Sequence, residues 1–421
     1  MTVFTKTLNL KIALLTLGCK VNQYETDAMK ERLEMAGAKI VPFGEAADVY
    51  IVNTCSVTNV ADKKSRQMLH RAKRKNPDAI LVAAGCYVQA AQEELEKDEL
   101  VDVMIGNNKK KEIVTILEAF VKTKQKESQV IDINHTNEFE EMGMSHIEGH
   151  TRAYIKVQDG CNQFCSYCII PYTRGRVRSR SLEEIKKEIR SLVEQGYQEF
   201  VLTGIHLSSY GVDMEPSMTL LTLIEEIGGI KGVERIRLGS LEPRIITEAF
   251  IEAVKEVPAF CPHFHLSLQS ACNDTLRRMN RKYTIEEYME KCNLIRRYFD
   301  HPAITTDVIV GFPGETPEEF EQTVKNLEKI NLYEMHVFKY SKRKGTRAEQ
   351  MPDQVEEKIK HERSLVLLEM TKRQKREYEE ALIGTQEEVL LEEEIEADGT
   401  SYYTGHTKRY VKIGVCGEHL E

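Results

Sequence analysis

The stretch Cys161-Asn-Gln-Phe-Cys-Ser-Tyr-Cys168 places three thiols at spacings of four and three residues within one short loop. Three thiolates are one fewer than a cubane cluster of four irons takes, so one iron would lack a protein ligand and could bind a substrate. The alternative is a structural zinc site that uses Cys165 and Cys168, but such sites usually need a second close pair of Cys or His. Cys261 and Cys272 are too far apart in the sequence to form that pair. The spacing therefore favours a cluster.

The spacing resembles the signature of the radical S-adenosylmethionine enzymes, in which three cysteines hold three irons and the cofactor chelates the fourth. The resemblance implies that Cys161, Cys165 and Cys168 hold a 4Fe–4S cluster. It also implies that Tyr167, the aromatic residue before the last cysteine, lies near the adenine of S-adenosylmethionine. Simple packing within the loop is the alternative role for this side chain.

Composition indicates an ordinary soluble protein. The chain has 421 residues, 41% hydrophobic and 30% charged, a length that suits about three domains. The N-terminal residues lack a secretory signal, and no apolar run approaches the ~20 residues of a membrane span. Ten cysteines without such a signal fit reduced thiols and metal ligands, so we expect a cytoplasmic protein with no membrane contact. A net charge of -9 argues against indiscriminate binding to nucleic acid, although local basic stretches can override it.

The first third of the chain alternates short apolar runs with segments of helical character. Such runs predict buried parallel strands in an open α/β sheet, here at residues 12–17, 49–52 and 80–84, with further strands at 101–105 and 130–133. Helices are expected between them, at residues 26–36 and 60–75.

A cysteine directly follows each of the first three predicted strands: Cys19, Cys55 and Cys86. Because the carboxyl ends of parallel strands lie along one edge of a sheet, these three thiols should converge in space. Buried cysteines can instead act as small hydrophobic residues. Three equivalent placements favour a second three-thiolate site.

The loops around these cysteines, residues 17–26, 53–59 and 84–89, resemble the N-terminal domain of the methylthiotransferases, radical S-adenosylmethionine enzymes with a second, auxiliary cluster. The resemblance implies that Cys19, Cys55 and Cys86 ligate a second 4Fe–4S cluster. It continues over nearly the whole chain, through residues 158–161, 171–180, 263–270, 279–284 and 307–316. Ala271 departs from the family, which usually has Gly after Gln-Ser, and this weakens a ligand-contact role for Ser270.

After a linker at residues 135–150, the alternation of strands and helices resumes. Six strands are expected, at 153–157, 200–203, 235–238, 264–268, 304–310 and 335–340, each followed by a helix. They predict a partial (β/α)6, TIM-like barrel with its active site at the strand carboxyl ends. Three helices carry predicted capping boxes: Ser181 with Glu184, Thr284 with Glu287, and Thr316 with Glu319.

Other residues at these strand ends are candidates to bind S-adenosylmethionine. Glycine permits close backbone approach to a ligand, and polar side chains can bond its ribose and amino acid groups. The candidates are Thr203, Gly204, Ser240, Glu242, Gln269, Asp307, Gly311 and Phe312. Ordinary turn formation is the alternative, above all around Gly311.

Three groups of basic residues are candidate RNA contacts. The first lies on the helix after Cys55, where a solvated helix face is the alternative. The second would project to one side of an extended segment, where it binds RNA phosphate or pairs with acidic groups of the same fold. The third lies in the C-terminal tail. The residues are Lys63, Lys64 and Arg66; Arg174, Arg176, Arg178 and Arg180; and Lys408 and Arg409.

The tail begins with a predicted long helix at residues 355–382, followed by strands at 387–392 and 402–415. Residues 403–411 resemble the core of the small RNA-binding TRAM barrel, and the segment 384–421 is short for a complete one. Tyr402, Tyr403 and Tyr410 are expected to stack bases or to fill the small core. The expected domains are an N-terminal methylthiotransferase domain (1–134), a radical S-adenosylmethionine domain (151–383) and a TRAM-like domain (384–421).

The resemblance implies the reaction: one S-adenosylmethionine methylates sulfur on the auxiliary cluster, and a second yields the radical that opens an unreactive carbon to the methylthio group. Residues 59–64 and 267–270 look like the branch that acts on N(6)-threonylcarbamoyladenosine at position 37 of tRNA. The alternatives are isopentenyladenosine in tRNA, an aspartate of a ribosomal protein, or a radical enzyme whose second cluster only carries electrons. An external electron donor of the flavodoxin or ferredoxin type is expected, and no obligate protein partner.

Overall fold

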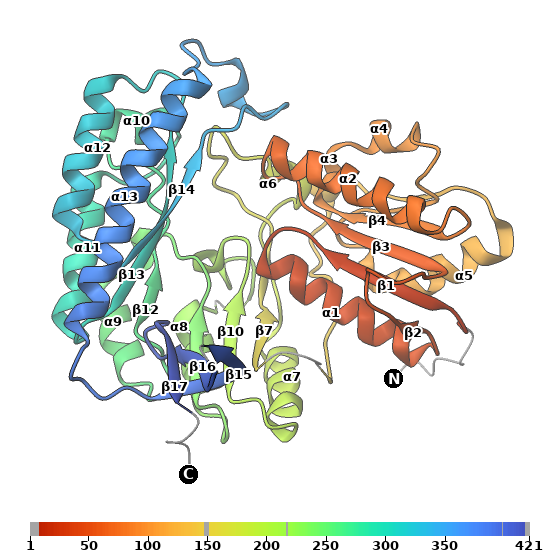
Figure 1. Ribbon diagram of the computed structural model, residues 1–421, viewed down its shortest axis with the longest axis horizontal. Helices are drawn as coiled ribbons and strands as arrows, with labels where there is room; N and C mark the ends of the chain where they lie inside the picture. Colours follow the sequence, from red (N-terminus) through yellow and green to blue (C-terminus); the bar gives the residue numbers. More distant parts are fainter. Residues whose placement is uncertain (1–7, 147–150, 216–217, 398, 417–421) are drawn as a thin grey trace.

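The computed structural model describes residues 8–146, 151–215, 218–397 and 399–416 (Figure 1). It confirms the expected mixed α/β fold, with a parallel N-terminal sheet, a barrel of parallel strands and a small antiparallel C-terminal sheet. The expected linker is irregular from residue 136 to 146, and its last four residues lie outside the described residues. Among the described residues, no helix is both long enough and apolar enough to cross a membrane.

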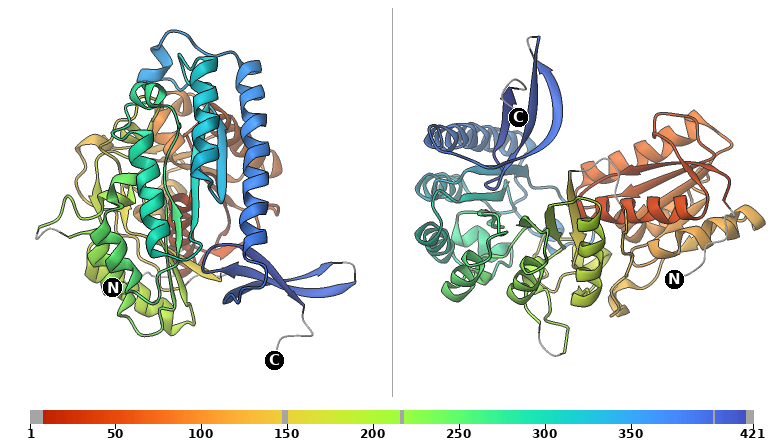
Figure 2. Two further views of the ribbon diagram at one scale, coloured as in Figure 1. Left: turned by 90° about the vertical axis from the view of Figure 1, so that its left-hand side faces the viewer. Right: turned by 90° about the horizontal axis from the view of Figure 1, so that it is seen from below.

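The N-terminal sheet has six parallel strands in the order β2-β1-β3-β4-β5-β6. Helices α1 and α5 pack on one face and α2 on the other, so the central strands are buried on both sides (Figure 2). Continuous apolar runs are typical of such strands. The strands are β1 (Lys11–Thr16), β2 (Lys39–Ile40), β3 (Val49–Thr54), β4 (Ile80–Gly85), β5 (Val103–Ile105) and β6 (Glu127–Gln129). The helices are α1 (Lys20–Met35), α2 (Asn59–Lys75), α3 (Cys86–Ala90), α4 (Gln92–Glu96) and α5 (Ile113–Thr123).

Two boundaries in this domain differ from the sequence prediction. The last strand lies at Glu127–Gln129 instead of 130–133, because Glu127 pairs with Val103 at the edge of the sheet and Ile133 begins a short 3-10 turn. Helix α1 begins six residues earlier than expected, directly after Cys19. Its first turns bury the polar residues Asn22 and Glu25, which hide the helical period of apolar residues.

The barrel has the six expected strands, in two three-stranded sheets with the orders β7-β10-β11 and β12-β13-β14. Isolated bridges such as Leu241 with Leu266 join the two sheets. The strands are β7 (Arg152–Lys156), β10 (Glu199–Thr203), β11 (Arg235–Leu238), β12 (His263–His265), β13 (Ala303–Val310) and β14 (Glu334–Lys339), with a separate two-stranded piece of β8 (Gln158–Asp159) and β9 (Arg178–Ser179). Phe200 and Leu202 of β10 pack in the apolar core, whereas Glu199 on the alternate face is ion-paired to arginines of β11.

Helices cover the outside of the barrel (Figure 2). They are α7 (Leu182–Glu194), α8 (Leu220–Gly228), α9 (Glu248–Lys255), α10 (Asn273–Arg278), α11 (Ile285–Tyr298), α12 (Pro317–Ile330) and α13 (Glu357–Ala381). The short helix α6 (Ile170–Thr173) lies instead beside α3 of the N-terminal domain. Ser181, Thr284 and Thr316 cap their helices as expected, and Thr284 with Glu287 forms the full reciprocal box.

The base of the C-terminal sheet contacts the amino-terminal ends of the barrel strands, and the rest of the sheet projects away from the barrel (Figure 2). Its strands are β15 (Val389–Ala397), β16 (Thr400–Thr407) and β17 (Lys412–Cys416). Arg235, at the start of β11, donates to the carbonyl of His406 at 2.9 Å and pairs with Glu388. The Tyr410 ring lies 4.6 Å from the guanidinium carbon of Arg237. This tyrosine therefore packs against the barrel strands, and the barrel opens at the opposite, carboxyl end of its strands.

Candidate active site

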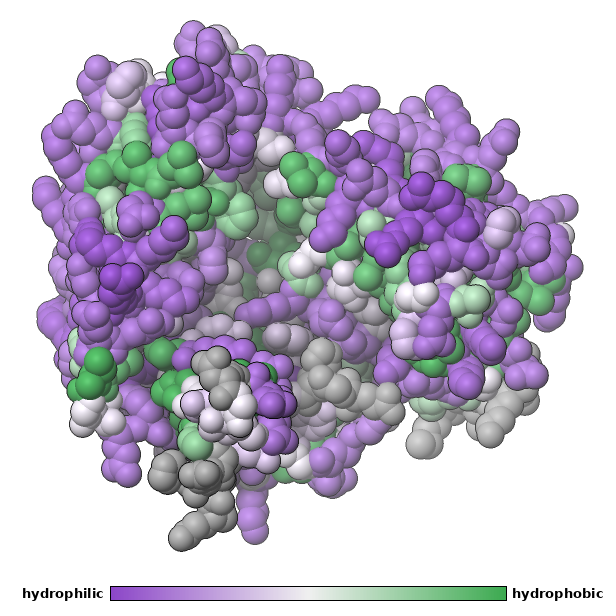
Figure 3. All heavy atoms as spheres, in the orientation of Figure 1, coloured by the Kyte–Doolittle hydropathy of each residue, from purple (hydrophilic) through white to green (hydrophobic). Residues whose placement is uncertain are grey.

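Between the N-terminal domain and the barrel lies a recess, which Figure 3 shows as a hollow in the surface. The two sets of cysteines follow strands of these two parts of the molecule. Helix α1 packs against β7, the edge strand of the barrel, and holds the two domains together on one side of the recess. On another side, Arg343 donates to the Ser56 hydroxyl at 2.5 Å and pairs with Asp62. These contacts fix the carboxyl edge of one sheet beside the carboxyl ends of the barrel strands.

Cys19, Cys55 and Cys86 lie at the carboxyl ends of β1, β3 and β4, where the sequence places them. Cys19 is the N-cap residue of α1, and Cys86 begins α3. Gly18 has a φ of +106°, and a Cβ atom there would lie 2.8 Å from the Cβ of Cys55, so only glycine allows this approach of β1 to Cys55. Three thiols from three strands thus meet at one edge of the sheet.

Asparagines hold the backbone between these cysteines. The Asn22 amide donates to the carbonyls of Leu17 and Thr54, at 2.7 and 3.0 Å. The Asn53 amide donates in turn to the Asn22 carbonyl at 2.9 Å. The ends of β1 and β3 are therefore cross-linked through the first turn of α1, which fixes the positions of Cys19 and Cys55 relative to each other.

The Cys161 loop follows β7 and β8 and is held by the segment after α10. The Ser166 N–H donates to the Met279 carbonyl at 3.0 Å, and the Asn280 amide donates to the Phe164 carbonyl at 3.0 Å. Arg281 donates to the Cys165 sulfur at 3.3 Å. A basic donor beside a cysteine sulfur fits a thiolate ligand.

Burial raises the pKa of Cys19, Cys55, Cys161 and Cys168 and makes these four thiols poor acids on their own. Burial, reinforced by Cys86, raises the pKa of Cys55 to about 11. Burial likewise raises the pKa of Cys161 to about 11, and burial together with Cys165 raises the pKa of Cys168 to about 12. Thiolates at these positions need a compensating positive charge, which bound iron provides. Both sets therefore fit a metal cluster as donors.

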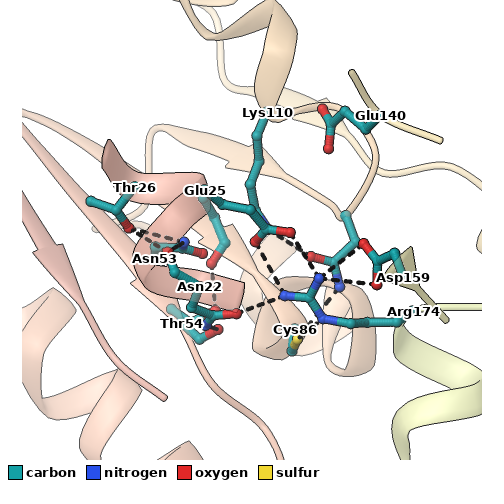
Figure 4. A network of polar contacts seen from close by, with 12 residues as sticks. Asn22, Glu25, Thr26, Asn53, Thr54, Cys86, Lys110, Glu140, Asp159 and Arg174 are labelled. Carbon is teal, nitrogen blue, oxygen red and sulfur yellow. Dashed lines mark hydrogen bonds and ion pairs between the residues drawn. The ribbon is translucent and has the colours of Figure 1, made fainter. Parts of the chain in front are cut away.

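A buried network of charges lies beside Cys86, where the N-terminal domain meets the barrel (Figure 4). Glu25 of α1 accepts from Lys156 Nζ at 2.7 Å and from Arg174 Nη1 at 2.8 Å, and it also pairs with Lys110. Asp159 pairs with Lys156 at 2.6 Å and with Arg174 at 3.1 Å. Arg174 Nε lies 3.3 Å from the Cys86 sulfur. The network thus connects the barrel to a cysteine of the N-terminal domain.

The structure places the predicted cofactor residues around the carboxyl end of the barrel. Tyr167 packs edge-on against Phe312, with ring centroids 6.2 Å apart. Thr203 ends β10, and a Cβ at Gly204 would lie 2.9 Å from Gln158 Oε1. Asp307 Oδ2 lies 3.3 Å from His265 Nε2, and Gln269 has a φ of +72°.

The remaining candidates differ in accessibility. Ser240 is exposed, whereas Glu242 is buried and accepts from Arg244 at 2.8 Å. At Gly311 a side chain would overlap Lys360, so the glycine serves packing against α13.

The predicted arginine stripe is wrong as an exposed RNA surface. Arg174, Arg178 and Arg180 are all buried. Only Arg178 lies in a strand, and Arg174 is the C-cap of α6, so the period-two pattern does not hold. Arg180 pairs with Glu188 and Glu141, as the alternative of acidic partners predicted. Arg176 is half-buried and lies over the Phe164 ring, 4.6 Å from its centroid.

Of the other basic candidates, those on α2 are exposed, whereas those in the tail contact other parts of the fold. Lys63 and Lys64 are exposed on the first turns of α2. Arg66 is also exposed and donates to the Tyr87 hydroxyl at 2.8 Å. In the tail, Arg409 binds the carbonyls of residues 300 and 301 and pairs with Glu387, so its guanidinium is used within the fold. Lys408 is half-buried, 4.0 Å from a Glu388 oxygen.

Sequence reasoning missed the polar residues that support the cysteines. Asn107 lies two residues after the end of β5, and its amide nitrogen is 3.5 Å from the Cys86 sulfur. The rule that parallel strands end at one edge of a sheet, which located the cysteines, could also have located this residue. Arg281 lies within the 279–284 motif, to which no role was given. Glu25, Lys110 and Lys156 carry no local signal, because each is recognisable only by its distant partners.

Comparison with known proteins agrees with this geometry. The model of the radical SAM superfamily matches residues 155–327, and that of the uncharacterized protein family UPF0004 matches residues 11–106. The chain is 40% identical to the threonylcarbamoyladenosine tRNA methylthiotransferase MtaB of Bacillus subtilis, over 96% of this chain and 89% of that protein. The protein of the same name from Aquifex aeolicus is 40% identical over 96% of this chain and 98% of its own length. A tRNA-2-methylthio-N(6)-dimethylallyladenosine synthase of Thermoanaerobacter pseudethanolicus is 36% identical over 91% and 82%.

Among solved structures, the radical S-adenosylmethionine methyltransferase TsrM of Kitasatospora setae has a similar fold, with a TM-score of 0.57 and 15% identity over 79% of this chain and 72% of that chain. The cobalamin-dependent radical enzyme OxsB gives a TM-score of 0.55 at 11% identity, over 87% and 56%. The expected cofactors, S-adenosylmethionine and 4Fe–4S clusters, are confirmed by the superfamily match and by the named relatives. From two cysteine sets at one recess and relatives that match along nearly all of its length, we conclude that the chain belongs to the radical S-adenosylmethionine methylthiotransferase family.

Proposed function

We propose that this enzyme transfers a methylthio group to C2 of N(6)-threonylcarbamoyladenosine, just 3′ of the anticodon in tRNA. The observation that carries the proposal is the convergence of two three-cysteine sets, from two different sheets, on one recess. The choice of nucleoside is supported by the names of the two 40% identical relatives. The Asn59–Lys64 segment, which resembles the same branch, adjoins the recess through Asp62 and its partner Arg343.

In this proposal Cys161, Cys165 and Cys168 hold one cluster, and Cys19, Cys55 and Cys86 hold the second. When bound, the clusters and S-adenosylmethionine supply the radical and the sulfur for the reaction. The chain itself orients these groups. Tyr167 and Phe312 offer an aromatic wall beside the first cluster, and the other strand-end candidates surround the same opening. The proposal also includes an external one-electron donor. It divides the chain into domains at residues 1–134, 151–383 and 384–421.

We place the tRNA backbone on a basic surface at the rim of the recess. Lys63 and Lys64 are exposed there, and Asn59, at the start of their helix, donates to the Lys342 carbonyl at 2.7 Å. Lys342 and Lys344 are exposed on the loop after β14. Two segments far apart in sequence thus present lysines side by side, as phosphate binding requires.

Mass spectrometry of nucleosides tests the proposal. The full-length enzyme, reconstituted anaerobically with iron and sulfide, is incubated with reductant, S-adenosylmethionine and tRNA that carries threonylcarbamoyladenosine. A methylthio product on that nucleoside is expected. A parallel reaction uses tRNA that carries isopentenyladenosine, since a 36% identical relative bears that activity in its name. Product only in the second reaction would refute the choice of substrate, and an iron content of a single cluster would refute the two-cluster assignment.

A further inference from the structure

Arg174 bridges the two cysteine sets. It caps the C-terminus of α6, a helix that begins two residues after Cys168, yet its side chain reaches into the N-terminal domain. Its Nε lies 3.3 Å from the Cys86 sulfur, and its Nη2 lies 2.6 Å from Asn22 Oδ1 (Figure 4). The guanidinium is completely buried. One side chain therefore links the segment after the first set to a member of the second.

Among the described residues, the Nε–H group of Arg174 donates only to the Cys86 sulfur, because other partners bind the two terminal nitrogens. Nη1 donates to Glu25 and Asp159, at 2.8 and 3.1 Å, and Nη2 donates to Asn22 and Glu25. Because the guanidinium is planar and rigid, anchoring both terminal nitrogens also fixes the direction of the Nε–H bond. The protein contacts of the guanidinium therefore aim that bond at Cys86.

A second donor to the same sulfur is fixed just as firmly. The Asn107 amide nitrogen lies 3.5 Å from the Cys86 sulfur and also donates to the Thr173 carbonyl at 2.7 Å. Lys110 donates to the Asn107 amide oxygen at 2.8 Å, which settles the orientation of the amide. Thr173 directly precedes Arg174, so both donors to Cys86 are positioned by the same turn of the barrel.

The charges around Arg174 do not cancel without an anion at Cys86. With every carboxylate ionised, four cations face three anions, which leaves one positive charge. The cations are Lys110, Lys156, Arg174 and Arg178, and the anions are Glu25, Asp159 and Glu140. Burial raises the pKa of Glu140, and a proton on that carboxyl would increase this positive excess. An excess charge in a buried site is costly, and a thiolate-ligated cluster is an anion of the right sign beside it.

We propose that Arg174 is a positioning residue for the auxiliary cluster, and that its Nε–H bond to the Cys86 sulfur raises the reduction potential of that cluster. Hydrogen bonds to cluster sulfurs and nearby positive charge both favour the reduced, more negative state. The inference rests on the proposed assignment of Cys86 as a cluster ligand. It adds that the barrel, through Arg174, sets the electronic properties of a cluster held by another domain.

The test isolates the auxiliary cluster in the full-length chain by replacing Cys161, Cys165 and Cys168 with Ala. This parent and the same chain with Arg174→Gln are reconstituted anaerobically with ferrous iron and sulfide. Their reduction is followed by electron paramagnetic resonance in a redox titration. Arg174→Gln is expected to lower the ratio of reduced to oxidised cluster at least tenfold at a fixed potential, a shift of about 59 mV for one electron. Resonance Raman spectra are expected to show stronger iron–Cys86 bonding.

Two further variants separate this effect from general damage. The Glu25→Gln/Arg174→Gln pair removes one anion with the cation and preserves the charge balance of the network, so it guards against misfolding of the single variant. Arg178→Gln removes a buried guanidinium 3.8 Å from Asp159 that makes no sulfur contact among the described residues. Arg178→Gln removes positive charge but no bond to sulfur, so its potential is expected to fall by less than that of Arg174→Gln. The expected order places the parent highest, Arg178→Gln below it and Arg174→Gln lowest, with the double variant also below the parent because it lacks the Nε–H bond.

Arg174→Gln and the double variant titrating with the parent would overturn the inference while leaving the two-cluster assignment intact. A parent that binds no iron after loss of the Cys161 loop thiols would overturn that assignment itself. The two failures are therefore distinguishable in one experiment.

Discussion

Replacement of Glu25 by Gln tests whether the buried charges dock the N-terminal domain on the barrel. Glu25 is 1% exposed and pairs with Lys110, Lys156 and Arg174, one from its own domain and two from the barrel. Removing one partner of a buried ionic group costs about 3–5 kcal/mol, because the opposite charges stay buried. Gln keeps the volume and one acceptor oxygen, so we expect about 3 kcal/mol, more than 100-fold in the unfolding equilibrium.

The same substitution should change how stability depends on pH. Burial raises the pKa of Glu25, but Arg174, Lys110 and Lys156 outweigh it and hold the pKa well below its usual value. A carboxyl with a depressed pKa in the folded state contributes stability that is complete above its unfolded pKa of about 4.3 and is lost as the pH falls below it. The difference between wild type and Glu25→Gln should therefore be constant near neutral pH and shrink below about pH 4.

Urea unfolding followed by circular dichroism measures both effects, with hydrogen exchange of α1 and β7 to locate the loss. Glu321→Gln is the matched control, since Glu321 pairs with Lys325 on the surface of α12 and the two side chains are 64% and 60% exposed. Such a pair is worth less than about 1 kcal/mol. Equal unfolding midpoints for the two variants, or a Glu25→Gln deficit that does not shrink in acid, would refute the role given to the network.

Three other substitutions probe the site and its surroundings. Cys19→Ala is expected to remove one of two clusters, so that iron and sulfide contents fall by about half on chemical analysis; loss of both would contradict independent sites. Gly160→Ala is expected to abolish binding of the first cluster, because its φ is +71° and a Cβ would overlap a backbone carbonyl, whereas Gly196→Ala, at φ +94° in open space, should cost only about 1–2 kcal/mol and retain full iron content. Lys63→Glu with Lys64→Glu should weaken tRNA binding in filter assays and lower the slope of log affinity against log salt by about 1.4–1.8; an unchanged slope would exclude this surface.

The convergence of the cysteines was predictable from sequence because it follows from a topological rule. A buried parallel strand is readable as an apolar run, and its carboxyl end is fixed by the sheet, so Cys19, Cys55 and Cys86 could be brought together without coordinates. The same reasoning placed the Cys161 loop after the first barrel strand. These inferences depend on one strand at a time and need no knowledge of distant partners.

The fate of the arginines was not predictable in this way. A basic run looks the same whether it faces solvent or carboxylates, and the carboxylates that bury Arg174 and Arg180 lie on α1, β8, α7 and residue 141. Glu25 and Glu188 look like ordinary surface residues of charged helices. The position of Tyr410 was also not predictable from the sequence. Its ring packs on Arg152 and Arg237 of the barrel and not only within the C-terminal sheet.

The contacts between the C-terminal sheet and the barrel bear on how the protein can be divided. In a fragment that ends at residue 383, the boundary suggested by sequence, Glu199 would be the one acidic partner left, among the described residues, to Arg152, Arg235 and Arg237. The tail thus stabilises the barrel as well as forming its own sheet, so its removal should lower the stability of the barrel.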